Sequence, residues 1–240
     1  MRFCVLQAGS PPRTVPPRCG GYGQMFVDLL AEAGQQWDVF PVEEGVFPEQ
    51  PLDYDGLVIT GSRHSVHDDL DWVRTLLHLI REVHRRERPL LGVCFGHQAI
   101  AHALGGEVAP NPKGWDIGIR EVFLTPEARN RAPLTGVSNP FRILESHQDV
   151  VTRLPRQALR LAGSDFSEHE MSLVCDSTLS LQGHPEFDAE VVRGIIEDQV
   201  ERQVISASQA REALRSLSDQ PDRAFLQGML KRFLRTGSLT

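Results

Sequence analysis

The 240-residue sequence predicts an α/β domain: a doubly wound, mostly parallel sheet with flanking helices and a small antiparallel addition. Two observations predict this fold. Between residues 3 and 104, short apolar runs of strand length alternate with longer amphipathic segments, which is typical of βαβ units. From about 106 to 183 the apolar runs are short and follow one another directly, which indicates additional strands. Ligands of doubly wound sheets bind beyond the carboxyl ends of the parallel strands, so we expect the functional residues there.

Four strands and three helices are predicted in the first part of the chain. The apolar residues of segment 69–86 recur at the three- and four-residue spacing of one helix face, and Gly34 is placed to end the preceding helix. The predicted strands are residues 3–7, 37–42, 56–60 and 90–94, and the helices are 20–33, 69–86 and a segment that includes 99–104.

The second part is predicted to add short strands and three helices. The strands are residues 118–124, 141–144, 159–162, 171–176 and 177–181, and the helices are 188–203, 206–217 and 221–234. The last helix carries a stripe of apolar side chains. Such a stripe packs on the chain's own domain, on a second copy in a homodimer, or on a partner protein.

Composition restricts the class of protein. The net charge of −7 disfavours a general nucleic-acid-binding protein, which is usually basic. We expect neither membrane insertion nor a signal peptide, because no window holds about 20 apolar residues and the N-terminus soon turns polar. The four cysteines form no Cys-x-x-Cys pair. A reduced, cytoplasmic location is therefore expected.

Cys94 occupies the most informative position of the sequence. It lies where a predicted strand meets a predicted helix, with Gly92 two residues before it and Gly96 two residues after. This is the Gly-x-nucleophile-x-Gly arrangement, in which a sharp turn exposes the nucleophile at the top of a sheet. The N-terminus of the following helix favours a thiolate over a thiol.

A nucleophilic cysteine needs a base, and the base needs a group that orients it. His184 follows the predicted strand 177–181, and Glu186 lies two residues beyond it. Pro185 stiffens the segment between them. Glu186 can therefore accept a hydrogen bond from one ring nitrogen of His184 while the other nitrogen faces Cys94. Partners of this kind are adjacent in space rather than in sequence.

Residues 92–98, GVCFGHQ, followed by residues 183–187, GHPEF, resemble the class I glutamine amidotransferase family. The resemblance extends over roughly residues 1–200, and segments 57–66, 113–118 and 146–151 match further family segments in order. It implies a flavodoxin-like sheet. We accordingly expect a catalytic domain at 1–204 and a helical extension at 205–240.

The resemblance implies that Cys94 attacks the γ-amide carbon of glutamine or of another γ-glutamyl group, with His184 as base and then acid and Glu186 orienting it. The amide of Phe95 and that of Ser62 or Gly61 are the expected oxyanion donors. The resemblance further implies that four polar residues contact the substrate: Gln98, Ser146, His147 and Gln148.

Two departures from the family pattern leave the substrate open. Ser62 and Gln148 stand where many members have glycine, and the motifs look more like the stand-alone branch that is similar to γ-glutamyl peptidases and to the glutaminase domain of GMP synthase. The first hypothesis is a glutaminase that supplies ammonia to a separate synthetase subunit. The alternatives are a γ-glutamyl peptidase and a catalytically silent protein of the same fold.

No cofactor and no metal site are predicted from the sequence. His64 and His67 have a spacing compatible with metal binding, but no carboxylate–histidine cluster is evident around them. Glycine-rich phosphate-binding motifs are also missing from the sequence, so nucleotide chemistry is not expected on this chain.

Overall fold

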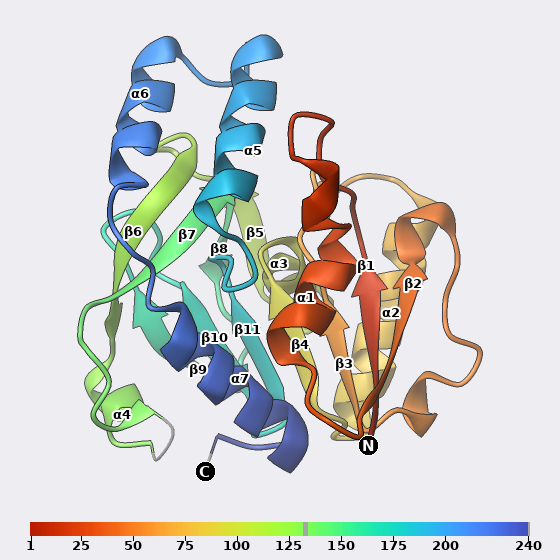
Figure 1. Cartoon of the computed structure of the whole chain (residues 1–240). Coiled ribbons are helices and arrows are strands. Elements are labelled where there is room, and N and C mark those ends of the chain that lie inside the picture. Colours follow the sequence, from red (N-terminus) through yellow and green to blue (C-terminus); the bar gives the residue numbers. More distant parts are fainter. Residues whose placement is uncertain (132–133, 240) are drawn as a thin grey trace.

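The computed structural model describes residues 1–131 and 134–239 (Figure 1). Within these residues, nine strands form one sheet in the order β2-β1-β3-β4-β11-β10-β9-β6-β7, and β5 and β8 form a separate pair. The strands are β1 Arg2–Gln7, β2 Gln36–Pro41, β3 Gly56–Ile59, β4 Leu90–Val93, β5 Glu107–Pro110, β6 Asp116–Leu124, β7 Phe141–His147, β8 Asp149–Arg153, β9 Ala158–Gly163, β10 Met171–Val174 and β11 Thr178–Leu181.

The sheet divides into a parallel part and an antiparallel part. Strands β2, β1, β3, β4 and β11 pair in parallel, whereas β10, β9, β6 and β7 pair antiparallel. The predicted fold class, a mostly parallel doubly wound sheet with an antiparallel addition, is therefore confirmed. The helices are α1 Tyr22–Leu30, α2 Asp71–Arg85, α3 Phe95–Ala103, α4 Pro126–Arg129, α5 Ala189–Glu201, α6 Ala207–Ser216 and α7 Arg223–Thr236, with short 3-10 turns η1 Pro17–Cys19, η2 Val42–Glu44 and η3 Pro51–Asp53.

Hydrophobic cores cover both faces of the parallel strands. In β1, Phe3 and Val5 join a cluster with α1 and α7, whereas Cys4 and Leu6 join a cluster with α2 and α3. Figure 1 shows α1 and α7 in front of the sheet and α2 behind it. Strands buried on both faces are continuous apolar runs, which is why the sequence pattern located them.

Two strands and one short helix were not predicted. β5 and β8 pair with each other. Neither shows a clear apolar pattern in the sequence, because each is short and carries polar or proline residues. β8 also begins inside the segment 146–151 that resembles a family segment. Gln148 is the one residue between β7 and β8. The four-residue helix α4 is too short for helical periodicity to be visible in sequence.

The C-terminal helices contact the rest of the fold. In α6, the Ser216 hydroxyl accepts a hydrogen bond from the Ile119 amide of β6 at 2.9 Å. In α7, the Gln227 side chain donates to the Leu29 carbonyl of α1 at 2.7 Å, and Phe233 is fully buried in the core cluster of Phe3. In the described residues, no helix combines the length and the apolar composition that crossing a bilayer requires.

We expect Phe233→Ala to lower the free energy of unfolding by about 3–5 kcal/mol, because it leaves a cavity where α7 joins the main core. Phe123→Ala is the matched control, since Phe123 is 46% exposed, and we expect it to change stability by less than about 1 kcal/mol. Urea titration of both variants measures the difference. Equal, small effects would show that residues 205–240 unfold separately from the sheet.

Candidate active site

Cys94 occupies a strained turn between β4 and α3. Its backbone has φ 53° and ψ −105°, a region that L-residues rarely adopt, and holding a residue there costs about 1–3 kcal/mol. Cys94 is the N-cap of α3, so its side chain lies where the first helical amides point. Only 5% of Cys94 is exposed. This is the nucleophile-elbow geometry that the glycine spacing predicts.

The two glycines of the motif are required by close packing. A Cβ atom on Gly92 would lie 2.5 Å from the Gly96 carbonyl oxygen, and a Cβ on Gly96 would lie 2.5 Å from the Ile59 carbonyl oxygen of β3. Both distances are far below van der Waals contact. The sequence therefore needs glycine on each side of Cys94 so that α3 can approach β3 and β4.

His184 is fixed by three different contacts. Its backbone amide donates to the Leu144 carbonyl at 2.7 Å, and its Nδ1 forms a 2.7 Å hydrogen bond with Glu186 Oε1. The Phe187 ring stacks on the imidazole with centroids 4.0 Å apart and planes 4° from parallel. His184 and Glu186 are both almost fully buried. The imidazole is thus held in one orientation before any ligand binds.

Strand pairing brings His184 to Cys94. β11 lies beside β4, with Leu181 opposite Val93, and the Cys94 amide donates to the Leu181 carbonyl at 2.8 Å. Gly61 borders both side chains: a Cβ there would lie 2.9 Å from His184 Cε1 and 3.7 Å from Cys94 Cβ. The carboxyl ends of β4 and β11 therefore place the sulfur and the imidazole next to the backbone of residues 61–62.

Electrostatics favour a protonated His184. Burial alone would lower the pKa of His184, but the charges of Glu186 and Cys94 and hydrogen bonds to both raise that pKa well above its ordinary value. The imidazole can therefore hold a proton beside the sulfur and hand it to a leaving group.

Hydrogen bonds of Thr60 and close packing on Gly9 hold the segment that contains Gly61 and Ser62 in place. The Thr60 hydroxyl accepts from the Ala8 amide at 3.0 Å and donates to the Gly61 carbonyl at 3.0 Å. Gly9 packs closely on Ser62, since a Cβ on Gly9 would lie 3.0 Å from Ser62 Cα. Phe95 is the first residue of α3, and its amide is one of those without an acceptor inside the helix.

Four residues were expected to bind substrate, and the structure places them differently from one another. The Ser146 carbonyl oxygen lies 4.0 Å from Cys94 Sγ, and Gln148 is exposed. Gln98 is buried, and its amide nitrogen donates to the Asp149 carbonyl at 2.8 Å and to Gln182 Oε1 at 3.2 Å. Gln98 therefore links the start of β8 to the segment that follows β11.

His147 lies in the interior, with both ring nitrogens facing protein groups. Its Nδ1 is 3.1 Å from the Asp149 carbonyl oxygen, and its Nε2 is 3.2 Å from Glu145 Oε2. This placement does not support a direct contact between His147 and substrate. The reason is strand alternation: along β7, the side chains of Glu145 and His147 project to one face and that of Ser146 to the other.

Two aromatic residues of the site were not identified from the sequence. Phe187 ends the GHPEF motif, but nothing in the motif reveals that its ring stacks on His184. Tyr22, which follows a pair of glycines at the start of α1, lies 5.6 Å from Phe187 between ring centroids. Burial, together with the charges of Cys94 and Glu186, raises the pKa of Tyr22, so its hydroxyl stays neutral and can donate a hydrogen bond.

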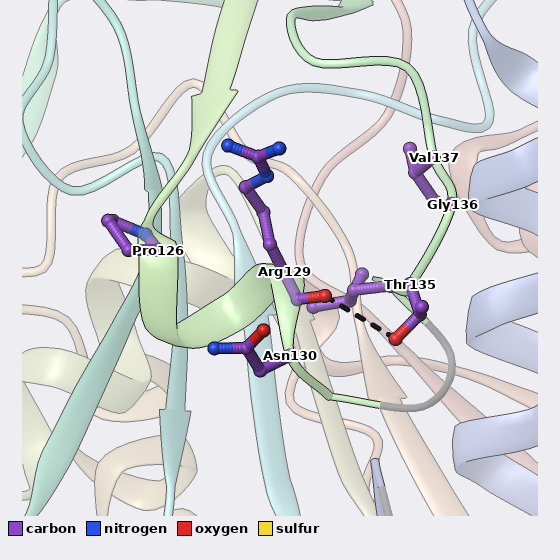
Figure 2. A pocket seen from close by; sticks show the side chains of 7 residues that line it. Pro126, Arg129, Asn130, Thr135, Gly136 and Val137 are labelled. Atoms are coloured by element: carbon purple, nitrogen blue, oxygen red, sulfur yellow. Dashed lines mark hydrogen bonds between the residues drawn. The ribbon is translucent and has the colours of Figure 1, made fainter.

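Cavities in the described residues also occur away from Cys94. Figure 2 shows one at α4 and the segment that follows it, where the Thr135 hydroxyl donates to the Arg129 carbonyl. Its described lining consists of Pro126, Arg129, Asn130, Leu134, Thr135, Gly136 and Val137. These residues include no cysteine, histidine or carboxylate. A second cavity, of about 270 Å³, lies beside Glu186 and is lined by Arg18 and Arg223 among others.

Comparison with known proteins identifies the family. A family model described as "Glutamine amidotransferase class-I" matches residues 19–201, and γ-glutamyl peptidase 3 of Arabidopsis thaliana is 35% identical over 98% of this chain and 96% of its own length. The chain belongs to the class I glutamine amidotransferase family.

Other similar proteins align over different shares of their length. The GMP synthase (glutamine-hydrolysing) of Porphyromonas gingivalis is 29% identical over 68% of this chain but only 31% of that protein. The crystal structure of a glutamine amidotransferase from Thermotoga maritima matches with a TM-score of 0.79 and 23% identity, covering 98% of this chain and 99% of that one. That likeness shows the shared fold.

The packing around the elbow leads to a stability prediction for this amidotransferase-family chain. Gly96→Ala should destabilise the fold by about 1–3 kcal/mol, because the new methyl group overlaps the Ile59 carbonyl. Gly228→Ala is the control. Gly228 is an exposed residue of α7, and a Cβ placed on it would have no atom within 4 Å, so alanine there should be neutral or stabilising by up to about 1 kcal/mol. Thermal and urea unfolding compare the two, and similar behaviour of both variants would contradict the tight α3–β3 contact.

Proposed function

We propose that this chain hydrolyses a γ-glutamyl amide bond, with Cys94 as nucleophile, His184 as general base and Glu186 as the residue that orients His184. One observation carries the proposal: the His184 imidazole, hydrogen-bonded to Glu186, lies beside the strained turn of Cys94. A nucleophile, a base and an orienting group in this relation define the Cys-His-acid form of acyl-transfer site. Membership of the amidotransferase family supplies the substrate class.

In this mechanism, the Cys94 sulfur attacks the γ-carbonyl carbon and the carbonyl oxygen becomes an oxyanion. The Phe95 amide at the start of α3 and the amide of Ser62 or Gly61 are the proposed donors to that oxygen. Loss of one such donor lowers the rate by about 10²–10³-fold in comparable enzymes. The rigid support of Thr60 beneath Gly61 keeps the donors in place.

The second half of the mechanism depends on the proton held by His184. Protonated His184 gives its proton to the leaving amine, and the acyl group remains on sulfur as a thioester. His184 then takes a proton from water, which attacks the thioester and releases glutamate. The raised pKa of His184 supports its role as the acid in the first half.

Two substrates compete within this function. Glutamine would yield ammonia, which a separate synthetase would consume, and the similarity to the GMP synthase supports that reading. A γ-glutamyl peptide would need no partner. The γ-glutamyl peptidase similarity extends over nearly the whole length of both chains, whereas the synthase match covers less than a third of that protein. This contrast favours a γ-glutamyl peptide as the substrate.

The experiment is release of glutamate by the purified chain from glutamine and from a panel of γ-glutamyl dipeptides. Turnover should fall by about 10³-fold or more in Cys94→Ser, since removal of the nucleophile leaves only binding and oxyanion stabilisation. Cys175→Ser, which alters an exposed thiol, is the matched control and should retain full activity. Faster turnover of a dipeptide than of glutamine supports the peptidase, and the reverse supports the ammonia-supplying enzyme.

Full activity of Cys94→Ser would overturn the nucleophile assignment. Inactivity of the unmodified chain on every substrate, combined with slow alkylation of Cys94 by iodoacetamide, would instead support a catalytically silent member of the fold. Alkylation is measured by mass spectrometry of the Cys94 peptide, with Cys175 as an internal reference thiol.

Glu186→Gln should change the pH profile as well as the rate. The Glu186 charge raises the pKa of His184, so its removal lowers that pKa, and His184 loses its proton at lower pH. The alkaline limb of kcat/KM should therefore move to lower pH, and kcat should fall by about 10²–10⁴-fold. Glu190→Gln, which alters a partly exposed carboxylate in the first turn of α5, should leave both unchanged. An unshifted alkaline limb in Glu186→Gln would show that Glu186 does not set the proton affinity of His184.

A further inference from the structure

A second group of ionisable side chains lies buried behind the site. It consists of Asp116 of β6, Glu145 and His147 of β7, and Glu170, which directly precedes β10. Each is at most 3% exposed. Asp116 is paired with His147 across the β6–β7 ladder, and Glu145 lies two residues from His147 on the same face of the strand. The register of two antiparallel strands therefore collects these groups in the interior.

The inward-facing atoms of this group are close together. His147 Nε2 is 3.2 Å from Glu145 Oε2 and 3.9 Å from Asp116 Oδ2. One ligand atom from each of Glu145, His147 and Glu170 lies within 4.8 Å of the others. An ion about 2.1 Å from each of two ligands joins atoms up to about 4.2 Å apart. Binding of an ion would require small side-chain rotations to close the remaining distance.

These atoms have no hydrogen-bond partner among the described residues. They are Asp116 Oδ2, both oxygens of Glu145, Glu170 Oε2 and His147 Nε2. The other atoms of the same side chains are hydrogen-bonded: Asp116 Oδ1 accepts from Arg120 Nε at 2.6 Å, and Glu170 Oε1 accepts from the Ser164 hydroxyl at 2.6 Å. Burial of a carboxylate oxygen without a hydrogen-bond partner costs free energy. A positive charge between the inward-facing atoms would offset this cost.

The hydrogen bond of His147 Nδ1 with the Asp149 carbonyl indicates that this positive charge is a metal ion. A backbone carbonyl only accepts, so Nδ1 of His147 must carry a proton in order to donate to the Asp149 carbonyl. In the neutral ring, the Nε2 lone pair then faces the Glu145 and Asp116 carboxylates. An imidazole that donates one N–H to a carbonyl and offers its other nitrogen to a set of carboxylates has the usual surroundings of a metal ligand.

We propose that Glu145, His147 and Glu170, assisted by Asp116, bind a divalent transition-metal ion of the Zn²⁺ or Mn²⁺ type inside the fold. Imidazole and carboxylate donors together suit these ions. The charges also balance: Arg120 neutralises Asp116, and a dication neutralises Glu145 and Glu170. This inference is independent of the proposed function.

Protons are the competing occupants. Burial, and next the charge of Asp116, raises the pKa of Glu145 well above its ordinary value, and burial with the charge of Glu145 does the same for Glu170. In the absence of metal, these shifts favour the protonated form of both carboxylates. The two occupancies differ in metal content, which can be measured directly.

The ion would join the strands that carry the catalytic candidates. Leu144, next to Glu145, accepts the His184 amide, and the Glu170 carbonyl accepts the Gln182 amide at 2.8 Å. Glu145 also fills the space over Gly183, where a Cβ would lie 2.3 Å from Glu145 Oε1. The metal would act as a structural clamp on the segment 182–184, with no chemistry at the ion itself.

The test is metal content of the untagged 240-residue chain. It is produced in medium supplemented with Zn²⁺ or Mn²⁺, so that the ion is present while the chain folds, and then dialysed against metal-free buffer. We expect about one ion per chain by inductively coupled plasma mass spectrometry. Glu170→Gln should lose most of it, since an amide replaces a charged ligand. Glu168→Gln, an exposed carboxylate two residues away that pairs with Arg160, should retain it.

Thermal unfolding gives a second readout of the same ion. At an ion concentration about 100-fold above Kd, Tm should rise by about 5–10 °C relative to chelator-treated protein in the unmodified chain and in Glu168→Gln. Less than about 0.1 ion per chain with no Tm change would overturn the proposal in favour of protonated carboxylates. Equal metal content in Glu170→Gln and Glu168→Gln would also overturn it, because the ion would then lie elsewhere.

Discussion

The parallel pairing of β4 with β11 is the constraint on which the site depends. Cys94 and His184 are ninety residues apart, and each lies just beyond the carboxyl end of its strand. The register that sets Val93 opposite Leu181 brings the sulfur and the imidazole to the carboxyl ends of neighbouring strands. The hydrogen bond from the Cys94 amide to the Leu181 carbonyl fixes their relative position along the strand direction. A slip of one residue would turn either side chain to the opposite face of the sheet.

Tight packing at the same edge creates the strained backbone of Cys94. The N-terminus of α3 comes so close to β3 and β4 that only glycine fits at positions 92 and 96. The unfavourable φ of Cys94 persists because the hydrophobic cluster that α3 shares with α2 and the sheet holds α3 in place. Stability of that core thus offsets local strain at the position where a projecting sulfur is useful.

Buried charge is the second constraint on this half of the molecule. His184 and Glu186 form one buried pair, and Asp116, Glu145, His147 and Glu170 form a neighbouring group that shares backbone contacts with the His184 segment. Removing so many ionisable groups from water is unfavourable unless each meets an opposite charge or a proton. The proton on His184 fits the Glu186 pair, and the proposed metal ion fits the second group. The first arrangement fixes the orientation of His184, and the second would fix residues 182–184.

The sequence by itself determined the parallel strands, the turn at Cys94 and the His184–Glu186 pair. These features are local: they rest on apolar runs, on the spacing of two glycines and on a five-residue motif. Only the tertiary structure decided that Phe187 stacks on His184, that Gln98 braces two segments, and that His147 faces Glu145 and Asp116 in the interior. Those outcomes depend on strand register, which decides whether residues such as Asp116, Glu145 and Glu170 lie close together. Pairing between strands that are distant in sequence leaves no periodic signal in a single sequence.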